Sequence, residues 1–83
     1  MSFHVYILYS ETVQQYYVGH TDNLEDRFYR HTNSGSKATK KAKDWKLVHA
    51  ELFETKAEAY RREMEIKNKK SRKYIEWLIR SAN

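Results

Sequence analysis

The sequence has 83 residues, a formal net charge of +5 and no cysteine. This length allows one domain with one modest core, and the lack of cysteine excludes disulfides and thiolate metal sites. No apolar stretch approaches the roughly 20 residues of a membrane helix, and the N-terminus has no secretory signal pattern. We therefore expect a single domain over residues 1–83 in the cytoplasm.

Three segments rich in β-branched and aromatic residues predict strands at residues 3–10, 16–20 and 46–53. The polar residues 11–15 separate the first two segments, so these two strands are expected to pair as a hairpin. Residues 36–45 carry many lysines with serine and threonine, and they predict a loop before the third strand.

Cap signals predict helices over about residues 22–33, 56–69 and 72–81. Thr55 and Glu58 have the spacing of a capping box, which satisfies backbone N–H groups at a helix start. The expected N-caps of the three helices are Thr21 or Asp22, Thr55, and Ser71. The order ββαβαα favours an α+β fold in which a small three-stranded antiparallel sheet is flanked by three helices.

Two tyrosines are expected side by side on neighbouring strands. Because side chains alternate across a strand, Tyr6 shares a sheet face with Tyr17 and Gly19 if the first two strands pair. Such a pair has two interpretations. It is a site for proton transfer, or it is a cross-strand aromatic contact that stabilises the sheet.

The first predicted helix carries Arg27 and His31, four residues apart, beside an apolar stripe of Leu24 and Phe28. A guanidinium next to an imidazole at the rim of a core is suited to binding an anion. The alternative is that Arg27 extends into solvent and His31 packs by its ring.

Glu63 stands at the centre of the otherwise buried face of the second helix, where an apolar residue is expected. A carboxylate there costs stability unless it is paired or binds a cation. The two interpretations are a metal ligand and an ion pair with Lys67 one turn later.

The positive charge is clustered in two runs, between Lys37 and Lys46 and between Lys67 and Lys73. Clustered basic residues indicate a polyanion such as nucleic acid as the partner, or a solvated basic face. The lysines expected to contact nucleic acid are Lys37, Lys40, Lys41, Lys43 and Lys67.

These residues together resemble the GIY-YIG nucleases. Val5-Tyr6-Ile7 and Tyr17-Val18-Gly19 are similar to the two tripeptide motifs of that family, although the first lacks its glycine and the second has valine for isoleucine. Arg27 and His31 stand where members have an arginine and, often, a histidine. The stretch from Ala59 to Lys67 resembles the segment with the metal-binding glutamate.

The resemblance spans about residues 3–80 and is to the short stand-alone bacterial type, similar also to the nuclease domain of the repair excinuclease. It implies a structure-selective DNA endonuclease of repair or recombination, with RNA not excluded as a substrate. It further implies that Glu63 holds one divalent ion, Mg²⁺ or Mn²⁺, and that Arg27 binds the phosphate oxygens. Tyr6 or Tyr17 would relay a proton, and His31 would support the tyrosine or the phosphate.

Two other functions compete with the nuclease interpretation. The first is a catalytically weak or inactive nucleic-acid-binding module with the same fold. The second is a protein-interaction domain whose basic surface binds an acidic partner. Retention of Tyr6, Tyr17, Arg27, His31 and Glu63 argues for the enzyme, because binding alone does not require the carboxylate. The sequence does not determine the oligomeric state.

Overall fold

The computed structural model describes residues 2–33 and 42–81, except the side chains of residues 30–33. The predicted order ββαβαα is confirmed. The elements are β1 (Phe3–Ser10), β2 (Gln15–Thr21), α1 (Leu24–Asn33), β3 (Lys46–Phe53), α2 (Lys56–Lys69) and α3 (Arg72–Ser81). Among the described helices, none is long and apolar enough to span a membrane.

The three strands form one antiparallel sheet in the order β2-β1-β3. β1 lies in the centre because its apolar residues are buried on both faces. Val5, Ile7 and Leu8 are fully buried and Tyr6 is 2% exposed. β2 and β3 are therefore the two edge strands, and β2 carries the second of the two tyrosines noted in the sequence.

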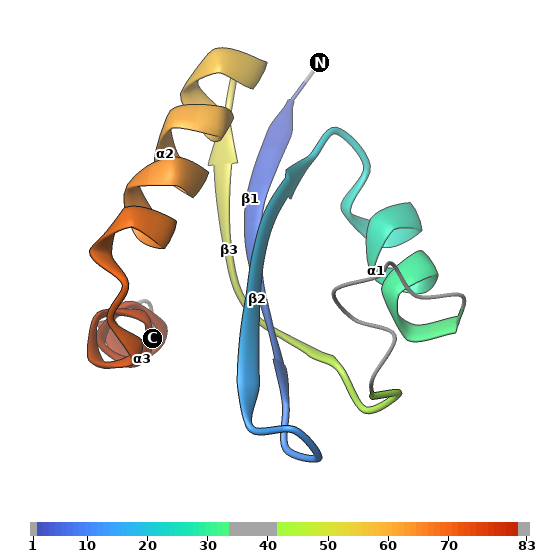
Figure 1. Ribbon diagram of the computed structural model, residues 1–83. Helices are drawn as coiled ribbons and strands as arrows, with labels where there is room; N and C mark the ends of the chain where they lie inside the picture. Colours follow the sequence, from blue (N-terminus) through green and yellow to red (C-terminus); the bar gives the residue numbers. More distant parts are fainter. Residues whose placement is uncertain (1, 34–41, 82–83) are drawn as a thin grey trace.

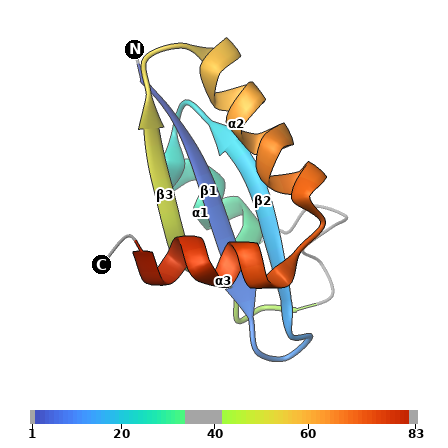
Figure 2. The ribbon, with the colours of Figure 1, turned by 90° about the vertical axis from the view of Figure 1, so that its left-hand side faces the viewer.

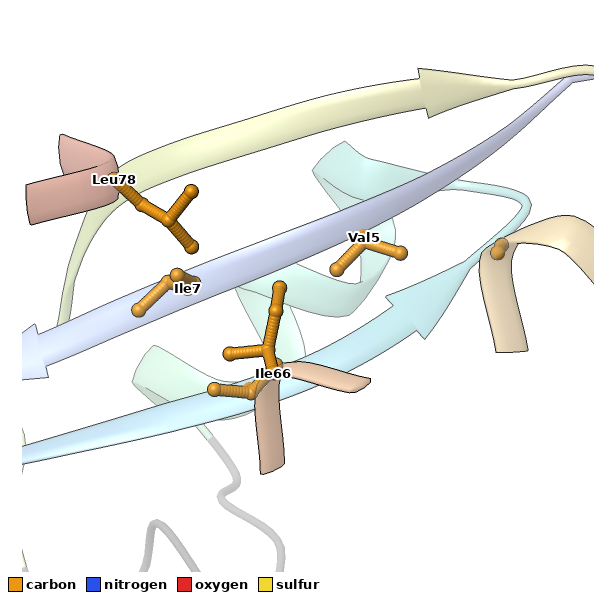
Figure 3. Close-up of a cluster of buried hydrophobic side chains, with 6 residues drawn as sticks. Val5, Ile7, Ile66 and Leu78 are labelled. Atoms are coloured by element: carbon orange, nitrogen blue, oxygen red, sulfur yellow. The ribbon is translucent and has the colours of Figure 1, made fainter. Parts of the chain in front are cut away.

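Helices cover both faces of the sheet. Figure 1 shows α1 on one side of the strands and α2 with α3 on the other. Figure 2 shows α3 crossing in front of the strands, with α1 behind the sheet. The core between the sheet and α2 and α3 contains Val5 and Ile7 of β1, which lie against Ile66 and Leu78 (Figure 3).

The opposite core contains residues that the sequence placed in a loop. Ala42 is 8% exposed and Trp45 is 4% exposed, and both pack with Tyr6 and Leu8. Leu24 and Phe28 of α1 border this cluster, as their apolar stripe predicted. Residues 42–45 are a loop, as expected, but Ala42 and Trp45 are buried because they fill this face of the sheet.

Asp44 fixes the start of β3 to the hairpin turn. The Ser10 hydroxyl donates to Asp44 Oδ1 at 2.5 Å, and the backbone N–H of Thr12 donates to Oδ2 at 3.1 Å. The hydrogen bond from Ser10 lowers the pKa of Asp44, so the carboxylate stays ionised in this clasp. The single acid in the first lysine run therefore has a structural partner.

The helix caps agree with the sequence at two of three starts. Thr55 accepts a hydrogen bond from the Glu58 N–H at 3.2 Å, and Ser71 accepts one from the Tyr74 N–H at 3.2 Å. The cap of α1 is Asn23 instead of Thr21 or Asp22, because Asn23 Oδ1 accepts from the Asp26 N–H at 3.1 Å. Thr21 uses its hydroxyl to bind the Asn23 N–H, so it is not free to cap the helix.

Candidate functional site

Tyr6 and Tyr17 lie on the same sheet face, as the strand alternation predicted. Tyr6 is opposite Gly19 and Leu8 is opposite Tyr17, so the two tyrosines are diagonal neighbours whose ring centroids are 6.3 Å apart. The Tyr6 ring covers Gly19. A Cβ atom at position 19 would lie 2.6 Å from the Tyr6 hydroxyl oxygen, so only glycine allows this approach.

Burial and three neighbouring side chains determine the pKa of the Tyr6 hydroxyl. Burial raises the pKa of Tyr6 well above its ordinary value, the Tyr17 phenol raises it further, the Arg27 charge lowers it, and the Glu63 charge raises it. Arg27, Tyr17 and Glu63 therefore all influence the protonation of the Tyr6 hydroxyl. The net result is a Tyr6 phenol that keeps its proton at neutral pH.

Glu63 is 8% exposed, and both of its carboxylate oxygens have partners. Lys67 Nζ lies 2.5 Å from Oε2, and His20 Nδ1 lies 2.5 Å from Oε1. Burial by itself would raise the pKa of Glu63, but the hydrogen bonds from Lys67 and His20 outweigh burial and hold this pKa below its ordinary value. The ion pair between Glu63 and Lys67, one of the two interpretations of the sequence, is thus present. Glu63 also has a second partner.

That second partner, His20, is the residue that sequence reasoning missed. An ionised carboxylate only accepts hydrogen bonds, so His20 Nδ1 carries the proton of this contact. Its ring also meets Tyr60 of α2 edge-on, with the centroids 6.0 Å apart. Strand alternation places His20 on the same face of β2 as Val18, but only the structure shows that α2 covers this face and that its polar residue there is Glu63.

Arg27 stands at the start of α1 and is exposed. It lines a hollow of about 150 Å³ between α1 and the end of β2, together with His20, Thr21 and Asp22. His20 thus borders this hollow and at the same time contacts Glu63.

The candidate residues come from both sides of the sheet. Tyr6 and Tyr17 pack in the cluster bordered by Leu24 and Phe28 of α1, whereas Glu63 belongs to α2. The two helices α1 and α2 lie on opposite sides of the sheet (Figures 1 and 2). The edge strand β2 carries Gly19, which has no side chain, and the Glu63 charge affects the pKa of the Tyr6 hydroxyl from the other side of the sheet. The candidate residues therefore do not share one face of the sheet.

The remaining predicted residues are only partly described. His31 lies in α1, but its side chain is outside the described part of the chain. Lys37, Lys40 and Lys41 also fall outside it. Lys43 is exposed, and Lys67 contacts Glu63 while its side chain keeps 44% exposure.

The donor set limits which metal this site suits. Among the side chains that the structure describes, no three or more His, Asp or Glu residues gather into a metal centre. Glu63 offers one ionised carboxylate, which is sufficient for Mg²⁺ when waters and substrate phosphates complete the shell. The residues therefore fit such an ion, provided that Lys67 or His20 releases one oxygen of Glu63.

Comparisons with known proteins show the family and agree with the fold. A family model described as the GIY-YIG catalytic domain matches residues 2–75. A UPF0213 protein of Staphylococcus saprophyticus is 44% identical over 61% of this chain and 63% of its own length. One from Limosilactobacillus reuteri is 34% identical over 93% of this chain and 82% of its own length. The solution structure of a UPF0213 protein from Bacillus halodurans has a TM-score of 0.60 and 34% identity, covering 95% of this chain and 83% of that chain.

Proposed function

The chain belongs to the GIY-YIG nuclease family, and on this basis we propose that it is a metal-dependent DNA endonuclease that hydrolyses phosphodiester bonds. The observation that carries the proposal is the position of the Tyr6 hydroxyl, which is buried over Gly19 with the Tyr17 ring beside it. The charges of Arg27 and Glu63, which lie on opposite sides of the sheet, both affect the pKa of this hydroxyl. A structural aromatic pair has no need of a phenol whose hydroxyl is held against a glycine.

In the proposed reaction, the oxygen of a water molecule attacks phosphorus and the bond to the leaving oxygen breaks. The water proton passes to a base of the site, and the leaving oxygen takes up a proton to become a hydroxyl group. Arg27 binds the non-bridging oxygens and stabilises the charge that grows on them. His31, one turn after Arg27, supports the phosphate or the tyrosine.

The tyrosines have the proton-transfer role. Tyr6 must lose its proton before it can accept one, and burial opposes that loss while positive charge favours it. Arg27 already acts in the favourable direction. Tyr17 is less buried than Tyr6 and is linked to it by a hydrogen bond, so a proton can move between the two phenols.

A divalent ion, Mg²⁺ or Mn²⁺, held by Glu63 would supply Lewis-acid stabilisation of the developing charge. His20 then orients the carboxylate through its second oxygen. The Lys67 ammonium would move from Glu63 to a phosphate oxygen, so the positive charge of Lys67 would be paired with a negative charge before and after the metal binds.

The proposed substrate is DNA recognised by structure, such as a nick, a flap, a branch or a single-stranded end, in repair or recombination. Lys37, Lys40, Lys41 and Lys43 would contact phosphates outside the site, and such contacts give affinity without sequence choice. A cleavage screen over these DNA forms, with RNA alongside, identifies the preferred substrate.

The test of the enzyme function is Glu63→Gln. This change keeps the side-chain shape and removes the charge that holds the metal, so cleavage with Mg²⁺ should fall by several orders of magnitude. The loss of charged hydrogen bonds to Lys67 and His20 should cost about 1–3 kcal/mol of unfolding free energy, which leaves the protein folded. Cleavage rate, thermal melting and DNA affinity in EDTA are measured together.

Glu54→Gln is the matched control, because Glu54 is exposed and lies outside the site. It should cut at the parent rate. A folded Glu63→Gln protein that also cuts at the parent rate would refute the metal role.

The second candidate function is a nucleic-acid-binding module without catalysis. One observation favours it: Lys67 and His20 satisfy both oxygens of Glu63 within the protein, so this residue has a structural use without metal. A parent protein that binds DNA yet cuts no substrate with Mg²⁺ or Mn²⁺ would establish this alternative.

A further inference from the structure

A groove of about 480 Å³ runs along the edge strand β2, next to the candidate site. One wall is residues 14–18, from the end of the hairpin turn into β2. The other wall is the end of α2 and the start of α3, where Lys67, Lys70 and Arg72 line the groove. Four residue steps along the strand wall span about 13 Å at about 3.3 Å per residue, which is longer than one phosphate group.

The groove is continuous with the candidate site through two shared residues. Tyr17 lines the groove and also pairs with Tyr6. Lys67 lines the groove and also contacts Glu63. A strand whose scissile phosphate lies at the candidate site therefore has an open path along β2 toward the hairpin turn.

The groove is lined by basic side chains, of which Lys67 pairs with Glu63 and Arg72 pairs with Glu76 outside the lining. It contains Lys67, Lys70 and Arg72, and none of its lining residues is an aspartate or a glutamate. The C-terminal end of α2 would by itself repel an anion, so the basic side chains at this helix end reverse the local sign of charge. This complementarity favours a polyanion over a neutral or cationic ligand.

The three cations differ in their availability. Arg72 is held in place, because it donates to the Gln14 carbonyl at 2.9 Å and its guanidinium lies 5.3 Å from the centre of the Tyr16 ring. Lys67 is engaged by Glu63. Lys70 is exposed, and its ammonium forms no ion pair with any acid in the described part of the chain.

We propose that this groove binds the phosphodiester backbone of the strand being cut, on one side of the scissile bond, with Lys70 contacting the phosphate. The proposal rests on the proposed nuclease function for the identity of the ligand. Lys70 ends α2 in a left-handed conformation, with φ of 49°, and its N–H donates to the Lys67 carbonyl at 3.2 Å. The backbone is thus fixed at the position from which the Lys70 side chain enters the groove.

The experiment compares Lys70→Asn with Lys73→Asn. Asparagine removes the charge and tolerates the left-handed conformation at position 70. Lys73 belongs to the same basic run and is exposed, but it does not line the groove. Each variant therefore loses one positive charge, at positions three residues apart in the sequence. Thermal melting verifies that both variants remain folded.

Binding of a fluorescent oligothymidylate is measured in EDTA over a range of KCl concentrations. Lys70→Asn should lower the slope of log affinity against log salt by about 0.7, the value for one lost single-strand phosphate contact. Lys73→Asn should keep the parent slope. Equal losses in both variants would show diffuse attraction and overturn the proposal, as would an unchanged slope in Lys70→Asn.

NMR locates the contact in this small protein. Titration with a short oligothymidylate should shift the backbone amides of residues 14–18 and 70–72, and the shifts should shrink in Lys70→Asn. Shifts confined to α1 and β3 would place the strand elsewhere and overturn the proposal.

The two proposals can fail separately. A parent that binds through this groove but never cuts would remove the nuclease function and keep the groove. A parent that cuts while Lys70→Asn binds with the parent slope would remove the groove and keep the nuclease.

Discussion

Gly19 sets the position of the Tyr6 hydroxyl. An added Cβ would lie 2.6 Å from the Tyr6 hydroxyl oxygen and 2.8 Å from Cζ, and the ring is 2% exposed, so it has little room to move away. We expect Gly19→Ala to lower the unfolding free energy by about 1–3 kcal/mol, the usual cost of overpacking. Cleavage should fall as well, because the hydroxyl is displaced. Urea unfolding and cleavage rates measure the two effects.

Tyr6→Phe provides the control for this clash. Phenylalanine lacks the oxygen that lies nearest the added Cβ, so Gly19→Ala should cost less stability in a Tyr6→Phe background than in the parent. An equal cost in both backgrounds would show that some other strain is responsible.

Single residues differed in how far the sequence predicted them. Strand alternation placed Tyr6 beside Tyr17, and the interruption of an apolar helix stripe identified Glu63. His20 could not be assigned in the same way, because its partner comes from a helix 43 residues away in sequence and alternation alone gave it only a core-facing position. Tertiary packing decides which polar groups meet, and no local pattern contains that information.

At the level of elements, one ion-pair network joins β3, α2 and α3. Arg62 of α2 donates to both carboxylate oxygens of Glu51 in β3, at 2.8 and 3.1 Å, and to the Tyr74 hydroxyl of α3 at 3.1 Å. Burial raises the pKa of Glu51, but hydrogen bonds from Arg62 and His49 outweigh it and lower this pKa below its ordinary value. The folded state therefore favours the charged form of Glu51.

This network predicts a loss of stability in acid. Because the pKa of Glu51 is lower in the folded chain than in the unfolded chain, its contribution is complete above the ordinary carboxyl pKa of 4.5. The contribution is lost as the pH falls through the folded value. Glu51→Gln should cost about 1.5–3 kcal/mol at pH 7, and its deficit relative to the parent should shrink as the pH approaches 3. Thermal melting between pH 7 and pH 3 measures this difference.

Asp44 and Glu63 also have lowered pKa values, so the parent loses stability in acid for several reasons. The comparison with Glu51→Gln isolates one of them. A deficit that stays constant down to pH 3 would mean that Glu51 is not ionised preferentially in the folded state.

Element boundaries followed from local chemistry where that chemistry was unambiguous. The capping box at Thr55 gave the start of α2, and β-branched runs gave all three strands. The start of α1 was misplaced because Thr21, Asp22 and Asn23 are all able to cap a helix, and tertiary context selects Asn23. The burial of Trp45 was missed because the surrounding lysines dominated the local composition.

The whole molecule has a central strand with a core on each face, and the sequence indicated part of this arrangement. The continuous apolar run in β1 explains why it lies in the middle of the sheet. The sequence did not show that Glu63 lies on the opposite side of the sheet from Tyr6 and Tyr17, because that requires knowing which helix covers which face.

The formal net charge of the molecule is +5, and four lysines of its first basic run contribute to it. Neutralising Lys37, Lys40, Lys41 and Lys43 together should weaken binding to all DNA sequences alike. It should also flatten the slope of log affinity against log salt by roughly 0.9 for each duplex phosphate contact that is lost. Affinity measured over a salt series for two unrelated duplexes decides the matter, and an unchanged slope would exclude these lysines from phosphate contact.

The two tryptophans lie on opposite sides of the sheet, so their fluorescence reports on the two sides separately. Trp45 is 4% exposed and belongs to the core on the α1 face, whereas Trp77 of α3 is 55% exposed and stacks on Tyr74 on the other side of the sheet. A shielded indole emits at shorter wavelengths than a hydrated one. The short-wavelength part of the fluorescence spectrum therefore comes from Trp45 and reports on the packing of the sheet face that carries the two tyrosines. Loss of that face during denaturation is thereby visible without any added label.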